Sequence, residues 1–322
     1  VLMTGCDGDI PIVLFFFASP STINQGESST LFWGVAKADT VTITPIGTVA
    51  SSGSIDISPG ITTEYTLIAT NSTGTVSASV TVTLPPVHNL TKNTYYKTIQ
   101  AALNDADNGD TIEVANGIYD ETIWFPSGKK VILQNVNGPN ITTIRGVWSI
   151  ATVHLNNSLP GTTIEGFTIT YAVGLSGRGI YNDLGSNLTI DNCTVSDNFI
   201  AGGNGGGILN YGTLTITGAS TISGNTADSG GGIYIDSLST TITASTISGN
   251  SADYDGGGIY IWIASFIPTI GGSSSAEKNT ICGNYKSGNS PSLDQQIRDS
   301  SGDLYDAYKD INYIGIYCPI II

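Results

Sequence analysis

A repeat of 25 to 26 residues constrains the fold of this 322-residue chain more than any other feature. Three near-identical motifs, Gly-Gly-Gly-Ile followed by Leu or Tyr, place Ile208, Ile233 and Ile259 at spacings of 25 and 26 residues. The motif Thr-Ile-Ser-Gly-Asn precedes the last two and ends at Asn225 and Asn250. A repeat this short predicts a stacked array in which each unit buries its apolar face against its neighbours.

Each repeat reads as one coil of three short strands, with glycine runs at a sharp turn between faces. In-register stacking predicts that Ile208, Ile233 and Ile259 form one file inside the solenoid. Variant copies of the second motif flank the clear ones and supply two more asparagines. The sequence therefore predicts a hydrogen-bonded turn ladder of Asn198, Asn225, Asn250 and Asn284.

These motifs resemble the repeats of right-handed parallel β-helix surface proteins, among them adhesins and autotransporter-like polymorphic outer-membrane proteins. Upstream, residues 96–106 place Ile99, Ala102 and Leu103 on one helical face. The segment Asn-Gly-Asp-Thr-Ile-Glu-Val follows, as it does after the capping helix of such a β-helix. The resemblance implies a right-handed parallel β-helix over residues 92–290 with a short N-terminal capping helix. It implies less about function, because a fold does not fix an activity.

Residues 10–84 show period-two alternation between turn signals, which indicates an all-β sandwich. Trp33 is the expected central aromatic of its core. The segment from Tyr65 to Ala69 resembles the Tyr-x-Cys-x-Ala of immunoglobulin domains, with Leu67 at the cysteine position. The segment as a whole resembles immunoglobulin-like modules of bacterial and archaeal surface proteins. The predicted all-β chain has an N-terminal extension (1–9), an immunoglobulin-like β-sandwich (10–84), a linker (85–91), a parallel β-helix (92–290) and a C-terminal cap with an apolar terminal strand (291–322).

The charge balance excludes several function classes. Eleven Lys and Arg against 26 Asp and Glu give a net charge of −15, and charged residues make up only 11% of the chain. A phosphate backbone needs a basic footprint, so nucleic acid is not an expected partner. No run reaches the ~18 apolar residues of a membrane span. With two histidines and no metal-ligand spacing, we predict no metal, no cofactor and no catalytic residues.

Polysaccharide hydrolases and lyases with a β-helix fold remain an alternative, because the chain resembles them in fold. The pectate lyases use an Arg base beside calcium-binding acids on neighbouring coils. The nearest approach to that pattern here is Arg178 with Asp183, Asp191 and Asp197. Asp is common in turns for conformational reasons alone, so we predict a protein that is not an enzyme.

Tyr181, Tyr234 and Tyr260 occupy equivalent positions in successive repeats. Alternation places them opposite the core isoleucines, hence on the outside of the solenoid. Exposed stacked tyrosines bind glycans in an adhesin, or else they cover the solenoid or a subunit contact. We favour packing, and keep a monomeric glycan-binding adhesin as an alternative function.

The four cysteines allow three disulfide pairings. Cys282 and Cys318 are the favoured pair because both lie near the C-terminus, and the parity of Cys193 predicts an inward side chain. Cys6 ends a Leu-Met-Thr-Gly-Cys segment that looks like a lipobox, so lipid anchoring there is an alternative to ordinary secretion. Uncharged, Thr-rich composition fits an exported protein, and candidate glycan acceptors stand in the sequons of Asn71, Asn89, Asn140, Asn156, Asn187 and Asn192.

Both ends of the chain are strongly apolar. The N-terminal run breaks the alternation of the other strands, so we expect it to be buried on both faces. A strand from one subunit completing a sheet in the next would give an open filament. The sequence therefore predicts an extracellular or cell-surface filament subunit whose main partner is another copy of itself, with surface glycans as a further candidate partner. The predicted head-to-tail contact residues are Ile12, Val13, Leu14, Phe15, Phe16, Phe17, Ile320, Ile321 and Ile322.

Overall fold

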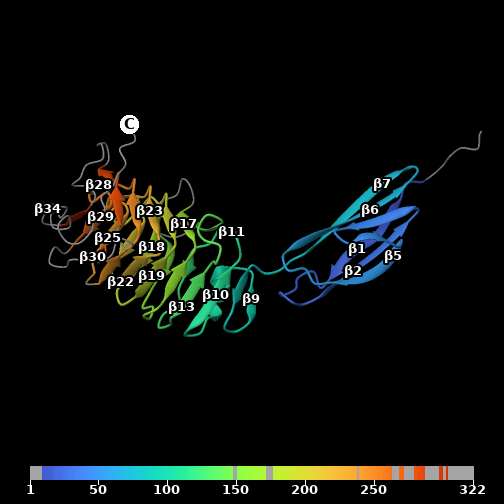
Figure 1. Cartoon of the computed structure of the whole chain (residues 1–322), viewed down its shortest axis with the longest axis horizontal. Coiled ribbons are helices and arrows are strands. Elements are labelled where there is room, and N and C mark those ends of the chain that lie inside the picture. The colour runs from blue at the N-terminus through green and yellow to red at the C-terminus, as the bar shows by residue number, and fades with distance from the viewer. Residues whose placement is uncertain are drawn as a thin grey trace, which may run out of the picture. The chain divides into compact units, whose positions relative to one another are not determined.

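The structure is a computed structural model that describes residues 9–147, 151–171, 177–237, 239–262, 268–271, 279–286, 297–299 and 302–303. The chain divides into two compact units, Val1–Pro85 and Pro86–Ile322. Apart from one short helix, the regular secondary structure of the described residues is all β-strand (Figure 1). We call the first unit the N-terminal β domain and the second the β-helix.

The N-terminal β domain contains two antiparallel sheets. The larger sheet has the order β4-β3-β6-β7 and the smaller has the order β1-β2-β5. Alternate side chains of these strands form one core, in which Leu31, Ile43 and Leu67 are fully buried. Trp33 packs in the same core, and its indole N–H donates to the carbonyl of Ala50 at 2.9 Å. The seven strands are β1 (Ile12–Ser19), β2 (Ser29–Ala36), β3 (Thr40–Thr44), β4 (Gly47–Val49), β5 (Ser52–Ile57), β6 (Thr63–Asn71) and β7 (Gly74–Val82).

Strand β1 differs from the expectation that it would be buried on both faces. It pairs only with β2, and the register shifts between Val13 and Phe15, so Leu14 is the extra residue of a β-bulge. Val13 and Phe16 pack against the domain core, whereas Phe15 and Phe17 remain 46% and 47% exposed. The bulge explains the broken alternation, because one inserted residue reverses the parity of the strand.

The β-helix consists of parallel sheets in which each strand pairs with the equivalent strand of the next coil (Figure 1). The chain is therefore a parallel β-helix repeat protein. The first sheet contains β9 (Thr94–Tyr96), β8 (Val87–Asn89), β10 (Asp110–Val114), β13 (Val131–Gln134), β16 (Thr163–Glu165), β19 (Asn187–Asp191), β22 (Thr213–Thr217), β26 (Thr240–Ile242) and β30 (Thr269–Ile270). The second contains β11 (Gly117–Tyr119), β14 (Thr142–Gly146), β17 (Thr168–Tyr171), β20 (Thr194–Ser196), β23 (Thr221–Ser223), β27 (Thr246–Ser248) and β31 (Thr280–Cys282).

The third sheet includes the strands that follow the glycine runs. Its members are β12 (Ile123–Trp124), β15 (Ala151–Leu155), β18 (Arg178–Asn182), β21 (Ile208–Asn210), β25 (Ile233–Ile235), β29 (Ile259–Ile261), β33 (Ile297–Asp299) and β34 (Gly302–Asp303). The repeat pattern had indicated three strands in a coil. A short fourth sheet also forms between the second and third, from β24 (Thr226–Ser229), β28 (Ser251–Asp255) and β32 (Tyr285–Lys286).

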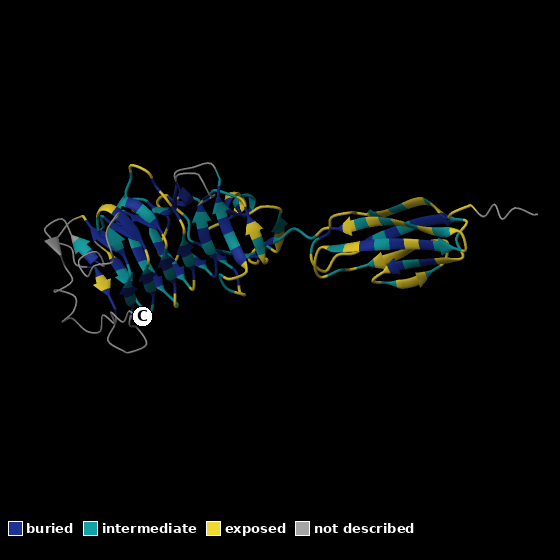
Figure 2. Ribbon diagram, turned by 90° about the horizontal axis from the view of Figure 1, so that it is seen from above, coloured by how far each residue is buried: buried dark blue, intermediate teal, exposed yellow. Residues whose placement is uncertain are grey.

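Stacked isoleucines form the core of the β-helix. Ile208 pairs with Ile233, and Ile233 pairs with Ile259, each fully buried in one continuous cluster. Figure 2 shows the buried residues recurring along the coils. Because similar apolar side chains recur at the same position in successive coils, each coil buries the apolar side chains of the coils next to it.

A second file stacks four buried asparagines in the turn after the second sheet. The side-chain amide of Asn198 donates to the Oδ1 of Asn225, Asn225 to Asn250, and Asn250 to Asn284, each at 2.9 Å. Each Oδ1 also accepts the backbone N–H of the preceding asparagine at 3.0–3.1 Å. The side-chain oxygens of Asn225, Asn250 and Asn284 are therefore satisfied within the file, whereas the Oδ1 of Asn198, at its end, is buried without a partner.

Each of the three glycines in a run is required for a different structural reason. Gly230 has φ +63°, which strongly favours glycine. A Cβ on Gly231 would lie 2.0 Å from the carbonyl oxygen of Ser251. A Cβ on Gly232 would lie 2.5 Å from the carbonyl of Gly258 and 3.0 Å from the amide of Asn250. The glycine runs thus let one coil approach the next and leave space for the asparagine file.

Helix α1 (Ile99–Asp105) lies at the N-terminal end of the β-helix and buries Ile99, Ala102 and Leu103. The Thr98 hydroxyl caps it, and the Glu121 carboxylate accepts the backbone N–H groups of Ile99 and Gln100 at 3.0 Å. A carboxylate at the N-terminus of a helix accepts hydrogen bonds from the free N–H groups there and interacts favourably with the positive end of the helix dipole. No helix within the described residues is long and apolar enough to span a membrane.

Two predicted boundaries of the β-helix are wrong. The expected linker over residues 85–91 contains β8, which pairs antiparallel with β10 and buries Val87 in the core. At the other end, the solenoid extends past residue 290, because Ile297 stacks on Ile259 and is 1% exposed. Both strands are only three residues long and lie among proline or polar loop residues, so the sequence pattern did not predict them.

Candidate functional site

The outer face of the third sheet holds a file of large side chains. The register aligns Trp124, His154, Tyr181, Leu209, Tyr234 and Tyr260 in successive coils. The rings of Trp124 and His154 stack face to face, with centroids 3.7 Å apart and planes 8° apart. Tyr234 and Tyr260 also stack, at 5.4 Å. Sequence reasoning found the tyrosines but missed Trp124 and His154, whose coils lack the glycine run.

Most of this file is closed to solvent. Leu209, Tyr234 and Tyr260 are 5–9% exposed and form a cluster separate from the solenoid core, with Tyr181 and Tyr211 packed against it. Tyr234 and Tyr260 are thus packed, as the favoured interpretation had it, and the alternative of glycan-accessible rings does not hold at these two positions. Gly230 and Gly256 also lie against Tyr234 and Tyr260. Tyr181 and Tyr211 remain half-buried.

Two basic groups belong to or adjoin this file: His154 is a member of it, and Arg178 lies beside Tyr181. Burial lowers the pKa of His154, and the positive charge of Arg178 lowers it further, while a hydrogen bond to the carbonyl of Ala151 opposes the shift. Burial also lowers the pKa of Arg178. Its Nε and Nη2 donate to the carbonyl of Asn204 at 3.3 and 3.2 Å, and its Cζ lies 5.9 Å from the Tyr181 ring centroid. These contacts give Arg178 a structural role under the 200–204 segment.

The acidic residues considered for catalysis are dispersed. Asp183 accepts the Tyr181 hydroxyl at 3.2 Å and the Leu184 N–H at 2.7 Å, so its carboxylate organises a turn. Asp197 has φ +56°, as turn residues often do. Within the described part of the chain, no group of three or more His, Cys, Asp or Glu side chains is arranged to hold a metal ion.

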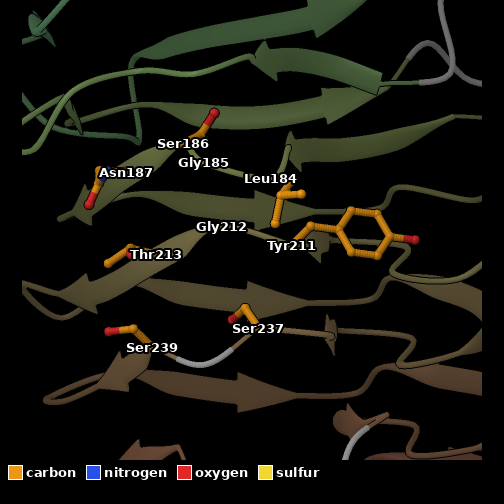
Figure 3. Close-up of a pocket in the computed structure, with 9 residues that line it drawn as sticks. All are labelled: Leu184, Gly185, Ser186, Asn187, Tyr211, Gly212, Thr213, Ser237 and Ser239. Carbon is orange, nitrogen blue, oxygen red and sulfur yellow. The ribbon is translucent and has the colours of Figure 1, made fainter.

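A groove of about 350 Å³, lined by both polar and apolar groups, crosses the corner between the third and first sheets. Three successive turns form it, and Figure 3 shows Leu184 and Tyr211 on one side of it and Thr213 and Ser239 on the other. Leu184 is 78% exposed. Sequence reasoning missed this groove, because its residues do not repeat and meet only when the turns stack.

A second exposed surface lies on the N-terminal β domain. We define the β1–β2 face as Ile12, Phe15, Phe17 and Phe32. The Phe17 and Phe32 rings stack with centroids 5.1 Å apart, and Phe15 lies 6.0 Å from Phe17. Phe15 also covers Gly34, where a Cβ would lie 2.6 Å from its ring. Within the described residues of this unit, these side chains are only partly covered: Ile12, Phe15 and Phe17 are 45–47% exposed, and Phe32 is half-buried.

The remaining predicted site residues lie in varied surroundings. Cys193 is fully buried, its thiol donates to backbone carbonyls, and burial raises the pKa of that thiol to about 12. Neither Cys193 nor Cys282 is in a disulfide within the described residues. Cys6, Cys318 and Ile320–Ile322 lie outside them.

The sequons divide by exposure. Asn140, Asn156 and Asn192 are exposed, and Asn71 and Asn187 are half-buried. The prediction that Asn89 accepts a glycan is wrong for the folded chain. Asn89 is fully buried, and its amide donates to Asp110 at 2.7 Å.

Comparison with known protein families identifies two of these coils. Residues 219–236 and 244–261 match the Chlamydia polymorphic membrane protein repeat. These two coils are similar to that repeat. The matched segments each run from the second-sheet strand through the asparagine and the glycine run to the third-sheet strand. No curated protein and no solved structure matches the chain.

Proposed function

We propose that this protein is a non-catalytic surface protein that assembles with copies of itself through the β1–β2 face. The observation that carries the proposal is the set of partly exposed aromatic rings on that face. Soluble monomers rarely leave contiguous large apolar side chains in water, and such patches mark interaction sites. Aromatic residues are also enriched in protein interfaces.

The position of β1 supports a contact between subunits. It is an edge strand of its sheet, so its outer edge offers free backbone groups beside the apolar rings. A joint of this kind would need about 1,000 Å² of buried surface to be stable. In the proposed head-to-tail form, the apolar C-terminal segment of a neighbouring copy supplies the other half. A contact between two different surfaces does not close and builds a filament.

Surface location is supported by several features. The repeat similar to the Chlamydia polymorphic membrane protein repeat comes from a membrane-protein family by its name. Under this proposal, the N-terminal β domain is an immunoglobulin-like spacer, and its strand orders β1-β2-β5 and β4-β3-β6-β7 fit a seven-stranded Greek-key sandwich. A Cys282–Cys318 disulfide and glycans on the exposed sequons complete the proposed extracellular form.

The experiment is light scattering on the whole chain over a range of concentrations. The wild type is expected to grow in mass with concentration, and a Phe15→Ser/Phe17→Ser variant is expected to stay monomeric. Ile118→Ser is the matched control, because Ile118 is 67% exposed on the β-helix. A wild type that is monomeric at every concentration would contradict the proposal. Truncation after Asn312 tests the head-to-tail form, since it removes only the C-terminal half of the joint.

The absence of catalysis is a separate part of the proposal. Its support is the dispersal of the acidic residues and the structural contacts of Arg178 and Asp183. Incubation with acidic and neutral polysaccharides is expected to release no products. Turnover that disappears in an Arg178→Ala variant would make the chain an enzyme and overturn this part.

A second candidate is a glycan-binding adhesin. The specific observation in its favour is the half-buried pair Tyr181 and Tyr211 beside the groove. The buried Tyr234 and Tyr260 cannot serve this role without disruption of the cluster that buries them.

A further inference from the structure

The chemistry of the corner groove points to a ligand class. Its lining presents the hydroxyls of Thr213, Ser237 and Ser239, whereas the Ser186 hydroxyl is buried and accepts the backbone N–H of Ser158, and the Asn187 amide donates to the carbonyl of Ser158. The volume of about 350 Å³ lies within the range of small-molecule sites. Hydroxyls both donate and accept, so they match a ligand that is itself rich in hydroxyls.

The floor of the groove is built on a rigid network. The amide of Asn182 donates to Asn210 at 2.6 Å, and Asn210 donates to the hydroxyls of Ser237 and Thr240 at 2.9 and 3.0 Å. Asn182 and Asn210 are fully buried. The Ser237 hydroxyl is therefore held in place before any ligand arrives, which reduces the entropy cost of binding.

One side of the groove supplies an apolar surface. The Tyr211 ring packs edge-on against Tyr181, with centroids 6.0 Å apart and planes at 76°. Leu184 stands beside it and is 78% exposed (Figure 3). A pyranose ring has one face of C–H groups and a periphery of hydroxyls. An aromatic wall next to a hydroxyl-lined floor meets both parts of such a ring.

The charges decide which sugars fit. No Lys or Arg is among the described residues that line the groove. Asp183 immediately precedes Leu184, and Asp236 immediately precedes Ser237. Neither carboxylate lines the groove, and that of Asp183 already accepts two hydrogen bonds, but both are negative charges beside lining residues and repel uronate or sialate groups. The chain's net charge of −15 adds to that repulsion.

We propose that the corner groove binds an uncharged oligosaccharide, with Tyr211 stacked on one sugar ring and the Ser and Thr hydroxyls on its edge. This site is distinct from the β1–β2 face and does not depend on self-assembly. Because three successive coils contribute to the groove, more than one sugar unit can lie along it.

The test is saturation-transfer NMR on the Phe15→Ser/Phe17→Ser chain, so that self-association does not enter the readout. The probes are hexasaccharides of glucose, mannose and N-acetylglucosamine, with hexagalacturonate as the charged comparison. We expect transfer to at least one neutral probe and none to hexagalacturonate. Absence of transfer to every neutral probe, or equal transfer to hexagalacturonate, would overturn the proposal.

Two variants locate the site. Tyr211→Ala removes the stacking ring and is expected to weaken binding about tenfold or more. Ser239→Trp fills the groove from an exposed position and is expected to abolish binding. Tyr254→Ala is the matched control, since Tyr254 is 62% exposed outside the groove, and should bind as before. Binding that survives in both groove variants would overturn the proposal, and circular dichroism checks that each variant is folded.

Discussion

The β-helix and the N-terminal β domain each carry a row of aromatic side chains on the outer face of a sheet, and only one of the two rows is covered. In the β-helix, the row from Tyr181 to Tyr260 packs in one cluster with the turn residue Tyr211, leaving Tyr234 5% exposed. In the N-terminal β domain, Phe15 and Phe17 lie on an edge strand and remain nearly half exposed. Figure 2 shows the same contrast, with more exposed residues on the strands of the N-terminal unit.

The difference shows which parts of the molecule bury the outer aromatic side chains of each unit. A stacked array covers its own side chains, because every coil has a neighbour with the same sequence. A two-sheet domain covers only the faces that point toward each other, so a large apolar residue on an outer face stays partly exposed. The β1–β2 face is the surface that our proposal assigns to contact with another copy of the chain.

The first prediction compares one substitution in both units. Ile233→Ala removes a fully buried side chain from a file with no room to rearrange, and we expect a loss of about 2–5 kcal/mol of unfolding free energy. Ile12→Ala removes a side chain that is 45% exposed, and should change stability by about 0.5 kcal/mol or less. Denaturant titration with calorimetry measures both. An equal loss of unfolding free energy in the two variants would contradict the difference in burial between the two units.

The second prediction concerns the asparagine file. Asn250→Ala leaves the backbone N–H of Asn225 without its acceptor and removes one of the two acceptors of the Asn225 amide, at a cost of about 1–3 kcal/mol. Asn140→Ala is the control, because Asn140 is exposed on a turn of the same unit. If the two variants unfold at the same denaturant concentration, the file contributes nothing to stability.

The third prediction is a pH dependence carried by His154. Burial lowers its pKa in the folded state, so the unfolded chain binds the proton more tightly. The stabilising contribution of neutral His154 is therefore present above the ordinary pKa of about 6.5 and is lost as the pH falls toward the folded-state pKa. His154→Phe keeps a ring against Trp124 and removes the titration.

The measurement for His154 is urea unfolding of wild type and variant at about pH 7.5 and about pH 5.5. Between these two pH values we expect the wild type to lose up to about 1 kcal/mol more than the variant. Carboxylate titration is common to both proteins. An identical pH dependence of stability in both would therefore show that His154 does not contribute to it.

Much of the β-helix follows from its sequence, because the repeat fixes both period and register. The 25- and 26-residue spacing aligns Ile208, Ile233 and Ile259, and the same alignment stacks Asn225 on Asn250. The capping helix is similarly legible from the spacing of Ile99, Ala102 and Leu103. These features depend on contacts between equivalent positions, which one sequence records directly.

Features that depend on contacts between non-equivalent positions of the coils could not be predicted from the sequence. The burial of Tyr234 comes from a cluster that includes the turn residue Tyr211, and the corner groove comes from three turns of different sequence. The bulge at Leu14 changed the expected burial of β1, since a single inserted residue leaves no composition signal. Strands β8 and β33 are too short for alternation to identify them.

Oxidative footprinting of the whole chain at low and high concentration tests the central claim most directly, that the β1–β2 face is where copies meet. Hydroxyl radicals modify exposed aromatic side chains, and mass spectrometry reads each one. We predict that Phe15 and Phe17 become protected as concentration rises, while Trp124 and Tyr254, at 52% and 62% exposure, do not change. Constant modification of Phe15 and Phe17 while the protein assembles would contradict the account.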